Sequence, residues 1–258
     1  MAQLQMRASQ AVSDGDERRF CSACAFSAAC LSQGFDKRAL NELHVLVEHA
    51  GPFAPGSFLF REREPFNAIA AVRAGTVKTC VFGSDGREQV LGFHRPGEII
   101  GLSAIHSDRY PCNAIAVDTV ELCRFSFPKI ALLATRMPGL QQQLFRLLSA
   151  DIGKATLLAG DFAADARVAA FLISLAQRAA RHCGSATHIS LPMPRTDIAS
   201  YLRLAPETVS RVLGRLQQSS VIRVERRELE VLDSTELERL AADVLRGRVE
   251  LDPDQGTR

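Results

Sequence analysis

The sequence predicts an α+β protein, in which an N-terminal antiparallel β-roll is followed by one long helix and a C-terminal winged helix-turn-helix. Three observations lead to this fold class. Short apolar runs alternate with turn signals early in the chain, the apolar spacing becomes helical after Met137-Pro138, and two helical patterns then flank a tight turn. The predicted divisions are an N-terminal segment, a β-roll, a connecting helix and a helix-turn-helix domain, over residues 1–35, 36–137, 138–162 and 163–258.

Composition sets the bounds for function. A chain of 258 residues with 47% hydrophobic residues is long enough to bury two cores. A net charge of +2 is too mild to indicate nucleic-acid binding over the whole surface, so such a function must come from a local motif. No run reaches the roughly 18 apolar residues that span a membrane, and residues 1–20 lack the apolar stretch of an export signal. We expect a cytoplasmic protein with reduced thiols and no membrane partner.

The N-terminal segment contains three cysteines within ten residues, Cys21, Cys24 and Cys30. Cysteines usually occur singly in cores, and a group this dense binds metal, forms disulfides or performs redox chemistry. Disulfides are disfavoured in a chain without an export signal. The residues alone leave an iron–sulfur cluster, a zinc site and a thiol-redox switch at comparable odds.

A helix is predicted over Asp36–Ala50, where leucines and Val47 recur at helical spacing before Gly51-Pro52. From Gly56 to about Lys129 the pattern changes to short apolar or alternating runs, of which residues 76–82 are typical. Turn signals such as Pro96-Gly97 separate these runs at regular spacing. This pattern indicates an antiparallel roll of about eight short strands.

The long helix after Met137-Pro138 carries an apolar seam with alternating steps of three and four residues. This spacing is typical of a helix that packs along a partner helix. An ordinary helix lying on its own domain explains so short a seam equally well, but a position between a β-domain and a helical domain favours a dimerisation helix. The seam residues are Phe145, Leu148, Ile152, Ala155, Ala159 and Phe162.

A further amphipathic helix is predicted over residues 164–182, and residues 195–216 form a helix, a tight turn and a second helix that starts near Pro206. On a helical wheel the second helix places Glu207, Ser210, Arg211 and Gly214 together. The opposite side is apolar and consists of Val209, Val212, Leu213 and Leu216. A short hairpin is expected over residues 221–232, which completes a winged helix-turn-helix.

The polar side of the second helix has the chemistry of major-groove recognition. Arg211 can donate to guanine O6 and N7, Glu207 can accept from a cytosine or adenine amino group, and Ser210 is small enough for close approach. We expect phosphate contacts from Arg195, Arg203 and Arg215. A solvated polar face on a plain helical hairpin is the alternative. Double-stranded DNA is therefore the predicted partner.

The chain resembles the cyclic-AMP receptor protein and FNR superfamily, and within it the FNR-type oxygen-responsive transcription regulators. The resemblance covers residues 21–240. It is carried by the cysteine triplet, by Gly92–Gly101 (GFHRPGEIIG) in the roll, by Met137-Pro138, and by Glu207–Arg211 (ETVSR) in the second helix. The resemblance implies a cyclic-nucleotide-binding-like roll, a homodimer that binds an inverted repeat of the TTGAT/ATCAA type, and RNA polymerase as a further partner.

The resemblance also implies a fourth cysteine ligand, which matches Cys123. Together with Cys21, Cys24 and Cys30 it would hold a [4Fe-4S] cluster, so that oxygen controls dimerisation and DNA binding. One position departs from the family, since Ala155 is uncharged where FNR-type regulators tend to carry a charge on the dimer seam. We therefore expect a dimer that is less sensitive to cluster loss than the family standard.

Other function classes fit the sequence less well. A cyclic-nucleotide pocket of this superfamily pairs a Gly-Glu element with an Arg-Ser pair; Gly97-Glu98 is present, but Pro111-Cys112 stands where the Arg-Ser pair belongs. Gly97 and Glu98 are therefore expected to serve the turn and the packing of the roll. An electron-transfer protein would leave the helix-turn-helix without a role, and no catalytic constellation is present. A regulator gated by thiol redox, zinc or a small ligand remains the alternative.

Overall fold

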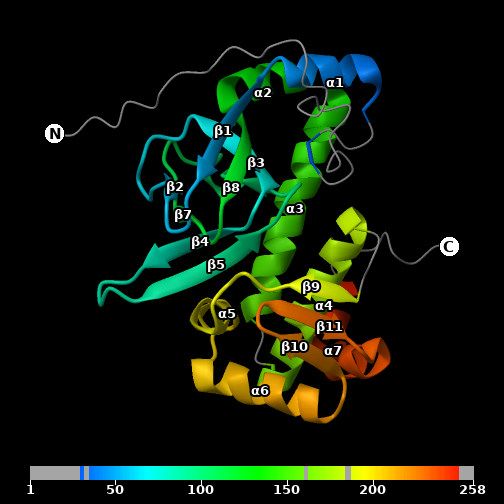
Figure 1. Ribbon diagram of the computed structural model, residues 1–258. Coiled ribbons are helices and arrows are strands. Elements are labelled where there is room, and N and C mark those ends of the chain that lie inside the picture. The colour runs from blue at the N-terminus through cyan, green and yellow to red at the C-terminus, as the bar shows by residue number, and fades with distance from the viewer. Residues whose placement is uncertain (1–29, 32–34, 160–161, 184–186, 250–258) are drawn as a thin grey trace.

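The computed structural model describes residues 30–31, 35–159, 162–183 and 187–249 (Figure 1). Within this part of the chain, eight strands form the two four-stranded antiparallel sheets of the roll, with strand orders β1-β8-β3-β6 and β2-β7-β4-β5. The predicted fold class is confirmed. The strands are β1 (Val47–Phe53), β2 (Phe58–Phe60), β3 (Ala68–Ala74), β4 (Val77–Phe82), β5 (Glu88–His94), β6 (Ile99–Ile100), β7 (Asn113–Ala116) and β8 (Val120–Ser126).

The helix predicted over Asp36–Ala50 is wrong in its second half. Helix α1 covers only Lys37–His44, capped by the Asp36 side chain, and strand β1 begins at Val47. Strand β1 pairs with β8 from Val47 opposite Phe125 to Phe53 opposite Val120. Sheet pairing therefore decides the conformation of a segment whose apolar spacing alone fits a helix. Gly51-Pro52 lies within the strand, at a register shift, and does not end a helix.

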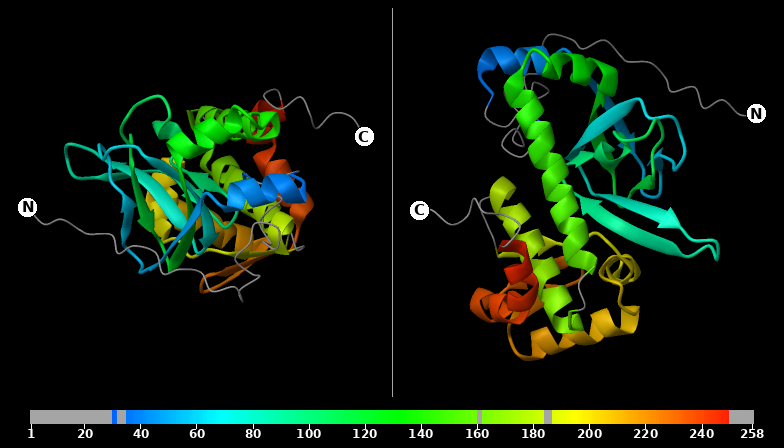
Figure 2. Two further views of the ribbon diagram at one scale, coloured as in Figure 1. Left: turned by 90° about the horizontal axis from the view of Figure 1, so that it is seen from above. Right: turned by 180° about the vertical axis from the view of Figure 1, so that it is seen from behind.

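Helices close one face of the roll. The first of them after the sheets, α2 (Phe127–Ala134), was not predicted, although Pro128 in its first turn is a helix-start signal. Helix α3 (Pro138–Ala159) then runs along the roll from the end near α1 toward the C-terminal domain (Figure 2). The buried residues between helices and sheet form the helix-side core, which consists of Leu31, Leu43, Ile69, Ala71, Ile99, Leu102, Phe125, Ile130, Leu140 and Leu144.

The C-terminal domain has the predicted winged helix-turn-helix. Helices α5 (Arg195–Leu202) and α6 (Pro206–Gln218) are followed by the hairpin of β10 (Ile222–Glu225) and β11 (Glu228–Val231). Helix α4 (Ala164–Cys183) supports them. Two further elements were not predicted: strand β9 (His188–Ser190), which pairs with β11, and helix α7 (Ser234–Val249), which packs on α4. Helix α6 lies at the end of the molecule opposite α1 (Figure 1).

The β4–β5 hairpin of the roll reaches the C-terminal domain. Val90 and Phe93 of β5 are buried in the same apolar core as residues of α4, α5 and α6. The Phe93 ring lies 6.2 Å from Phe171 of α4 and 5.5 Å from Tyr201 of α5, centroid to centroid. The roll and the helix-turn-helix are thus packed together through one shared core. Among the described residues no helix is long and apolar enough to cross a membrane.

Candidate DNA-binding surface and cysteine site

Helix α6 has the two faces that its sequence predicts. Val209, Val212, Leu213 and Leu216 are buried, whereas Glu207, Ser210 and Arg211 are exposed. In the free protein the Ser210 hydroxyl donates to the Pro206 carbonyl at 3.0 Å, and Arg211 Nε donates to the Glu207 carbonyl at 3.3 Å. These polar side chains contact only their own helix in these bonds, so the face is available to a ligand.

The three arginines predicted to contact phosphates have different environments. Arg203 is exposed and ends α5 in the left-handed conformation, with φ +53°. Arg195 starts α5 and is half-buried, and this burial lowers the pKa of its guanidinium. Arg215 forms an exposed ion pair with Asp165 of α4 at 2.5 Å. Arg203 and Arg215 are both exposed, and Arg215 must exchange its carboxylate for a phosphate to bind DNA.

The predicted dimer seam is partly visible on α3. Phe145 is 59% exposed and Ile152 is 70% exposed, two turns apart on the helix. Leu148, by contrast, is half-buried and packs against the helix-side core. The side chains of Ala155 and Ala159 lie outside the described residues, and Phe162 follows the end of the helix. Exposed large apolar side chains at this spacing fit a surface that a second helix would cover.

Two of the four predicted cluster ligands are described. Cys30 and Cys123 are both half-buried, and both pack against the helix-side core. Cys21 and Cys24 lie outside the described residues. Within the described part of the chain no three metal-ligating side chains come together, as expected when half of the proposed ligand set is not included. The structure thus brings Cys30 and Cys123 to one face of the roll.

Two other cysteines are more deeply buried than Cys30 and Cys123. Cys80 and Cys112 are buried in the roll. Burial raises the pKa of the Cys80 thiol to about 12 and that of the Cys112 thiol to about 11. Metal binds to thiolates, so these protonated thiols are poor ligands, while the accessible Cys30 and Cys123 fit a thiolate-held cluster. The side chain of Cys183 lies outside the described residues.

The end of the cysteine segment is attached to α3. Leu31 is fully buried in the helix-side core, and the Cys30 carbonyl accepts a hydrogen bond from Gln143 Nε2 at 3.3 Å. Gln143 is itself only 3% exposed. A polar side chain this deep holds its position through its hydrogen bonds. Gln143 therefore connects the backbone of a predicted ligand to the helix that carries Phe145.

Cys123 has a histidine beside it that the sequence did not reveal. His49 on β1 is directly opposite Cys123 on β8, and its Nδ1 lies 3.7 Å from Cys123 Sγ. No spacing in the sequence relates His49 to Cys123. The two positions are 74 residues apart, and only the register of β1 against β8 brings them together.

Glu98 has the structural role that the sequence predicted, and a further one. Gly97 adopts φ +87°, and Glu98 Oε2 accepts a hydrogen bond from the Arg95 amide at 2.8 Å. The same carboxylate forms an ion pair with Arg178 of α4 at 3.3 Å. Glu98 thus joins the roll to the C-terminal domain.

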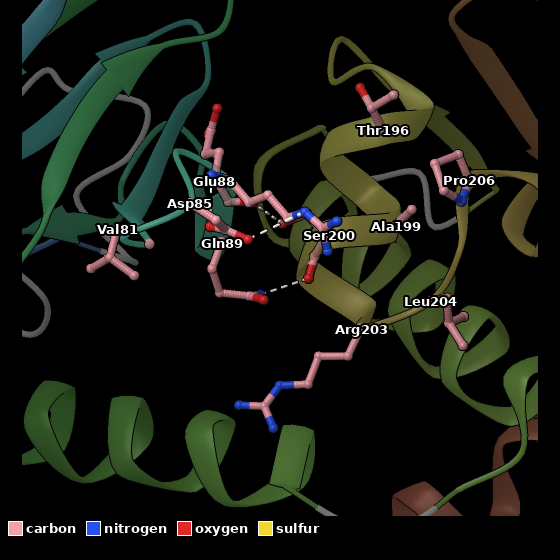
Figure 3. Close-up of a pocket in the computed structure, with 12 residues that line it drawn as sticks. Val81, Asp85, Glu88, Gln89, Thr196, Ala199, Ser200, Arg203, Leu204 and Pro206 are labelled. Atoms are coloured by element: carbon pink, nitrogen blue, oxygen red, sulfur yellow. Dashed lines mark hydrogen bonds and ion pairs between the residues drawn. The ribbon is translucent and has the colours of Figure 1, made fainter.

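A second polar contact joins the β4–β5 hairpin to α5 beside an open cleft (Figure 3). Lys78 Nζ lies 2.7 Å from Glu88 and 2.9 Å from Asp197 of α5. Burial alone would lower the pKa of Lys78, but the two carboxylates outweigh burial and raise that pKa. Ser200 accepts from the Val90 amide, and Gln89 donates to the Ser200 carbonyl, at 2.9 and 2.7 Å. We call these contacts the hairpin–α5 contact.

Family models match both halves of the chain. The Crp-like helix-turn-helix domain matches residues 166–240, and the cyclic nucleotide-binding domain matches residues 51–135. The transcriptional activator protein anr of Pseudomonas aeruginosa is 38% identical over 88% of this chain and 94% of its own length. The chain belongs to the CRP/FNR family. It is a DNA-binding transcription regulator and not an enzyme.

Further relatives agree with this assignment. The fumarate and nitrate reduction regulatory protein of Salmonella typhi is 34% identical over 86% of this chain and 90% of its own length. Among solved structures, FixK2 from Bradyrhizobium japonicum superposes with a TM-score of 0.69 and 26% identity, covering 75% of this chain and 96% of that protein. The CRP/FNR fold therefore includes both the roll and the helix-turn-helix of this chain.

Proposed function

We propose that this CRP/FNR regulator responds to oxygen through a [4Fe-4S] cluster held by Cys21, Cys24, Cys30 and Cys123. The observation that carries the proposal is the contrast among the thiols: Cys30 and Cys123 are accessible on one face of the roll, while Cys80 and Cys112 are buried and protonated. A bound cluster would supply a group that oxygen destroys. The names of the relatives, which include an activator and a fumarate and nitrate reduction regulator, support an anaerobic role.

Two of the proposed ligands, Cys123 and Cys30, are connected to the sheet and to α3 respectively. Cys123 is fixed in the centre of a sheet, paired with strands on both sides. Cys30 continues into buried Leu31 and accepts the Gln143 hydrogen bond from α3. When all four thiolates are ligated, the cysteine segment is tied to both the sheet and α3. If the ligation is lost, Leu31 and the Gln143 hydrogen bond would still hold the end of the segment at α3.

The exposed face of α3 is the proposed dimer surface. Phe145 and Ile152 would be covered by the same residues of a second copy, as a two-fold interface requires. In that dimer two α6 helices would reach successive major grooves of an inverted TTGAT/ATCAA-type repeat, where Glu207, Ser210 and Arg211 contact bases. A single helix-turn-helix makes too few contacts for tight specific binding. Dimerisation is therefore the step through which the cluster controls DNA binding.

Anaerobic purification tests the proposal. The protein should contain about four iron and four sulfide ions per chain and absorb in the visible charge-transfer region, and both should be lost in air. A protein with neither iron nor acid-labile sulfide would contradict the sensing function. Zinc in place of iron, or reversible thiol oxidation without metal, would support the alternative of a regulator gated by zinc or thiol redox.

A further inference from the structure

The residue pair His49 and Cys123 is built into the sheet. The two residues are directly opposite in the antiparallel β1–β8 pair, so their side chains project from the same face. His49 Nδ1 lies 3.7 Å from Cys123 Sγ, within range of a hydrogen bond to sulfur. On the other side of Cys123, strand β3 places Ala71 opposite, and a methyl group donates no hydrogen bond. Of the two residues that pair with Cys123 on the neighbouring strands, His49 is therefore the one whose side chain can form a hydrogen bond to the thiol.

The pairing of β1 with β8 fixes the position of His49 relative to Cys123. The flanking pairs, Glu48 with Arg124 and Ala50 with Leu122, continue the same register. A one-residue slip would move His49 to the opposite face and expose the apolar side chains of the strand, so the register is strongly specified. Both His49 and Cys123 are half-buried, where a hydrogen bond is screened less by water than on the surface. The geometry is therefore set by the sheet and does not depend on a loop.

We propose that His49 is a positioning residue of the cysteine site, whose Nδ1–H donates a hydrogen bond to the Cys123 thiolate. This inference rests on the proposed function, in which Cys123 is a cluster ligand. The hydrogen bond would stabilise the charge on sulfur and orient the side chain toward the bound group. Partners of this kind commonly change the affinity of a metal site by about 10-fold to 100-fold when they are removed. His49 would therefore slow the release of Cys123 from the cluster.

Two substitutions separate the hydrogen bond from the bulk of the side chain. His49→Leu removes the donor and keeps an apolar side chain on the strand, while His49→Asn keeps an N–H close to the position of Nδ1. Glu48→Ala is the matched control, because Glu48 is the preceding residue of the same strand and projects from the other face of the sheet. Thermal unfolding of each apoprotein shows whether the variants fold.

The measurement is the loss of the visible cluster absorbance in air at constant pH, with iron and sulfide contents before exposure. His49→Leu should lose the absorbance about 10-fold faster than the wild type, His49→Asn should recover most of the difference, and Glu48→Ala should match the wild type. Equal rates for His49→Leu and the wild type, with full clusters in both, would refute the role of His49 and leave the proposed function standing. A wild type without a cluster would refute both.

Discussion

The two sheets of the β-roll make contacts of different chemistry. The sheet that contains β1 and β8 meets α1, α2 and α3 through an apolar core, and two half-buried thiols, Cys30 and Cys123, pack against this core. The β4–β5 hairpin of the other sheet and the turn after it meet α4 and α5 through partly buried ion pairs and a shared aromatic core. The first contact therefore contains the two proposed cluster ligands, whereas the second is made of ion pairs, hydrogen bonds and aromatic rings.

This difference indicates how a signal would pass through the molecule. In the proposed mechanism the thiol side would respond to loss of the cluster, because Cys30 is connected to α3 through the Gln143 hydrogen bond and is followed by buried Leu31. The hairpin–α5 contact keeps the roll and the helix-turn-helix together, because Lys78 and Asp197 are 13% and 15% exposed and pair within 2.9 Å. The response to oxygen is therefore expected in α3 and in dimerisation, while each protomer keeps its two domains packed.

The largest expected effect distinguishes the two sets of cysteines. Cys123→Ser should remove essentially all iron and sulfide from anaerobically purified protein, because a hydroxyl is a poor replacement for a thiolate ligand. Cys112→Ser should retain them, because the buried, protonated Cys112 thiol is not a ligand. Iron and sulfide analysis measures both variants. A full iron content in Cys123→Ser would remove Cys123 from the site.

The hairpin–α5 contact should dominate the stability of the domain arrangement. Asp197→Ala leaves the partly buried Lys78 paired with Glu88 alone and should lower the free energy of unfolding by about 2 kcal/mol, measured in urea. Asp165→Ala is the matched control, since it removes an exposed ion pair with Arg215 and should change stability by less than about 1 kcal/mol. Equal losses in the two variants would mean that the hairpin contact is no stronger than a surface pair.

Base recognition by α6 is the next effect in size. Arg211→Ala should lose about 1–3 kcal/mol of binding free energy at one guanine of each half-site and relax the preference there. Competition binding with single-base operator variants measures this change. Arg203→Ala serves as the comparison, because a phosphate contact weakens binding to all sequences alike. A uniform loss in Arg211→Ala would instead make Arg211 a phosphate contact.

The smallest effect concerns the link from the cysteine segment to α3. Gln143→Leu removes the hydrogen bond to the Cys30 carbonyl. The free energy of dimerisation of the anaerobic protein should become less favourable by about 1 kcal/mol. Iron content should stay unchanged, while anaerobic sedimentation shows a higher monomer fraction. Gln142→Leu is the control, since Gln142 is exposed on the same helix. An unchanged dimer affinity would place the coupling elsewhere.

Much of this arrangement follows from the sequence, and the exceptions have physical reasons. The two faces of α6 were predictable because the helical spacing places the apolar Val209 and Val212 on one side and the charged Arg211 on the other. The end of α1 was not, because Val47 fits a helical stripe and a strand equally well until β8 pairs with it. Long-range register also hid the neighbours His49 and Cys123, and the pairing of Glu98 with Arg178. The cysteine triplet was evident, but its ligand role required the resemblance.

The most direct test of the central claim is DNA binding by the same protein with and without its cluster. Anaerobic protein with full iron and sulfide should bind an inverted TTGAT/ATCAA repeat as a dimer. Timed exposure to air should reduce binding in proportion to the remaining cluster absorbance, with a residual dimer at high protein concentration because Ala155 is uncharged. Equally tight and specific binding by protein that contains no iron would contradict the account.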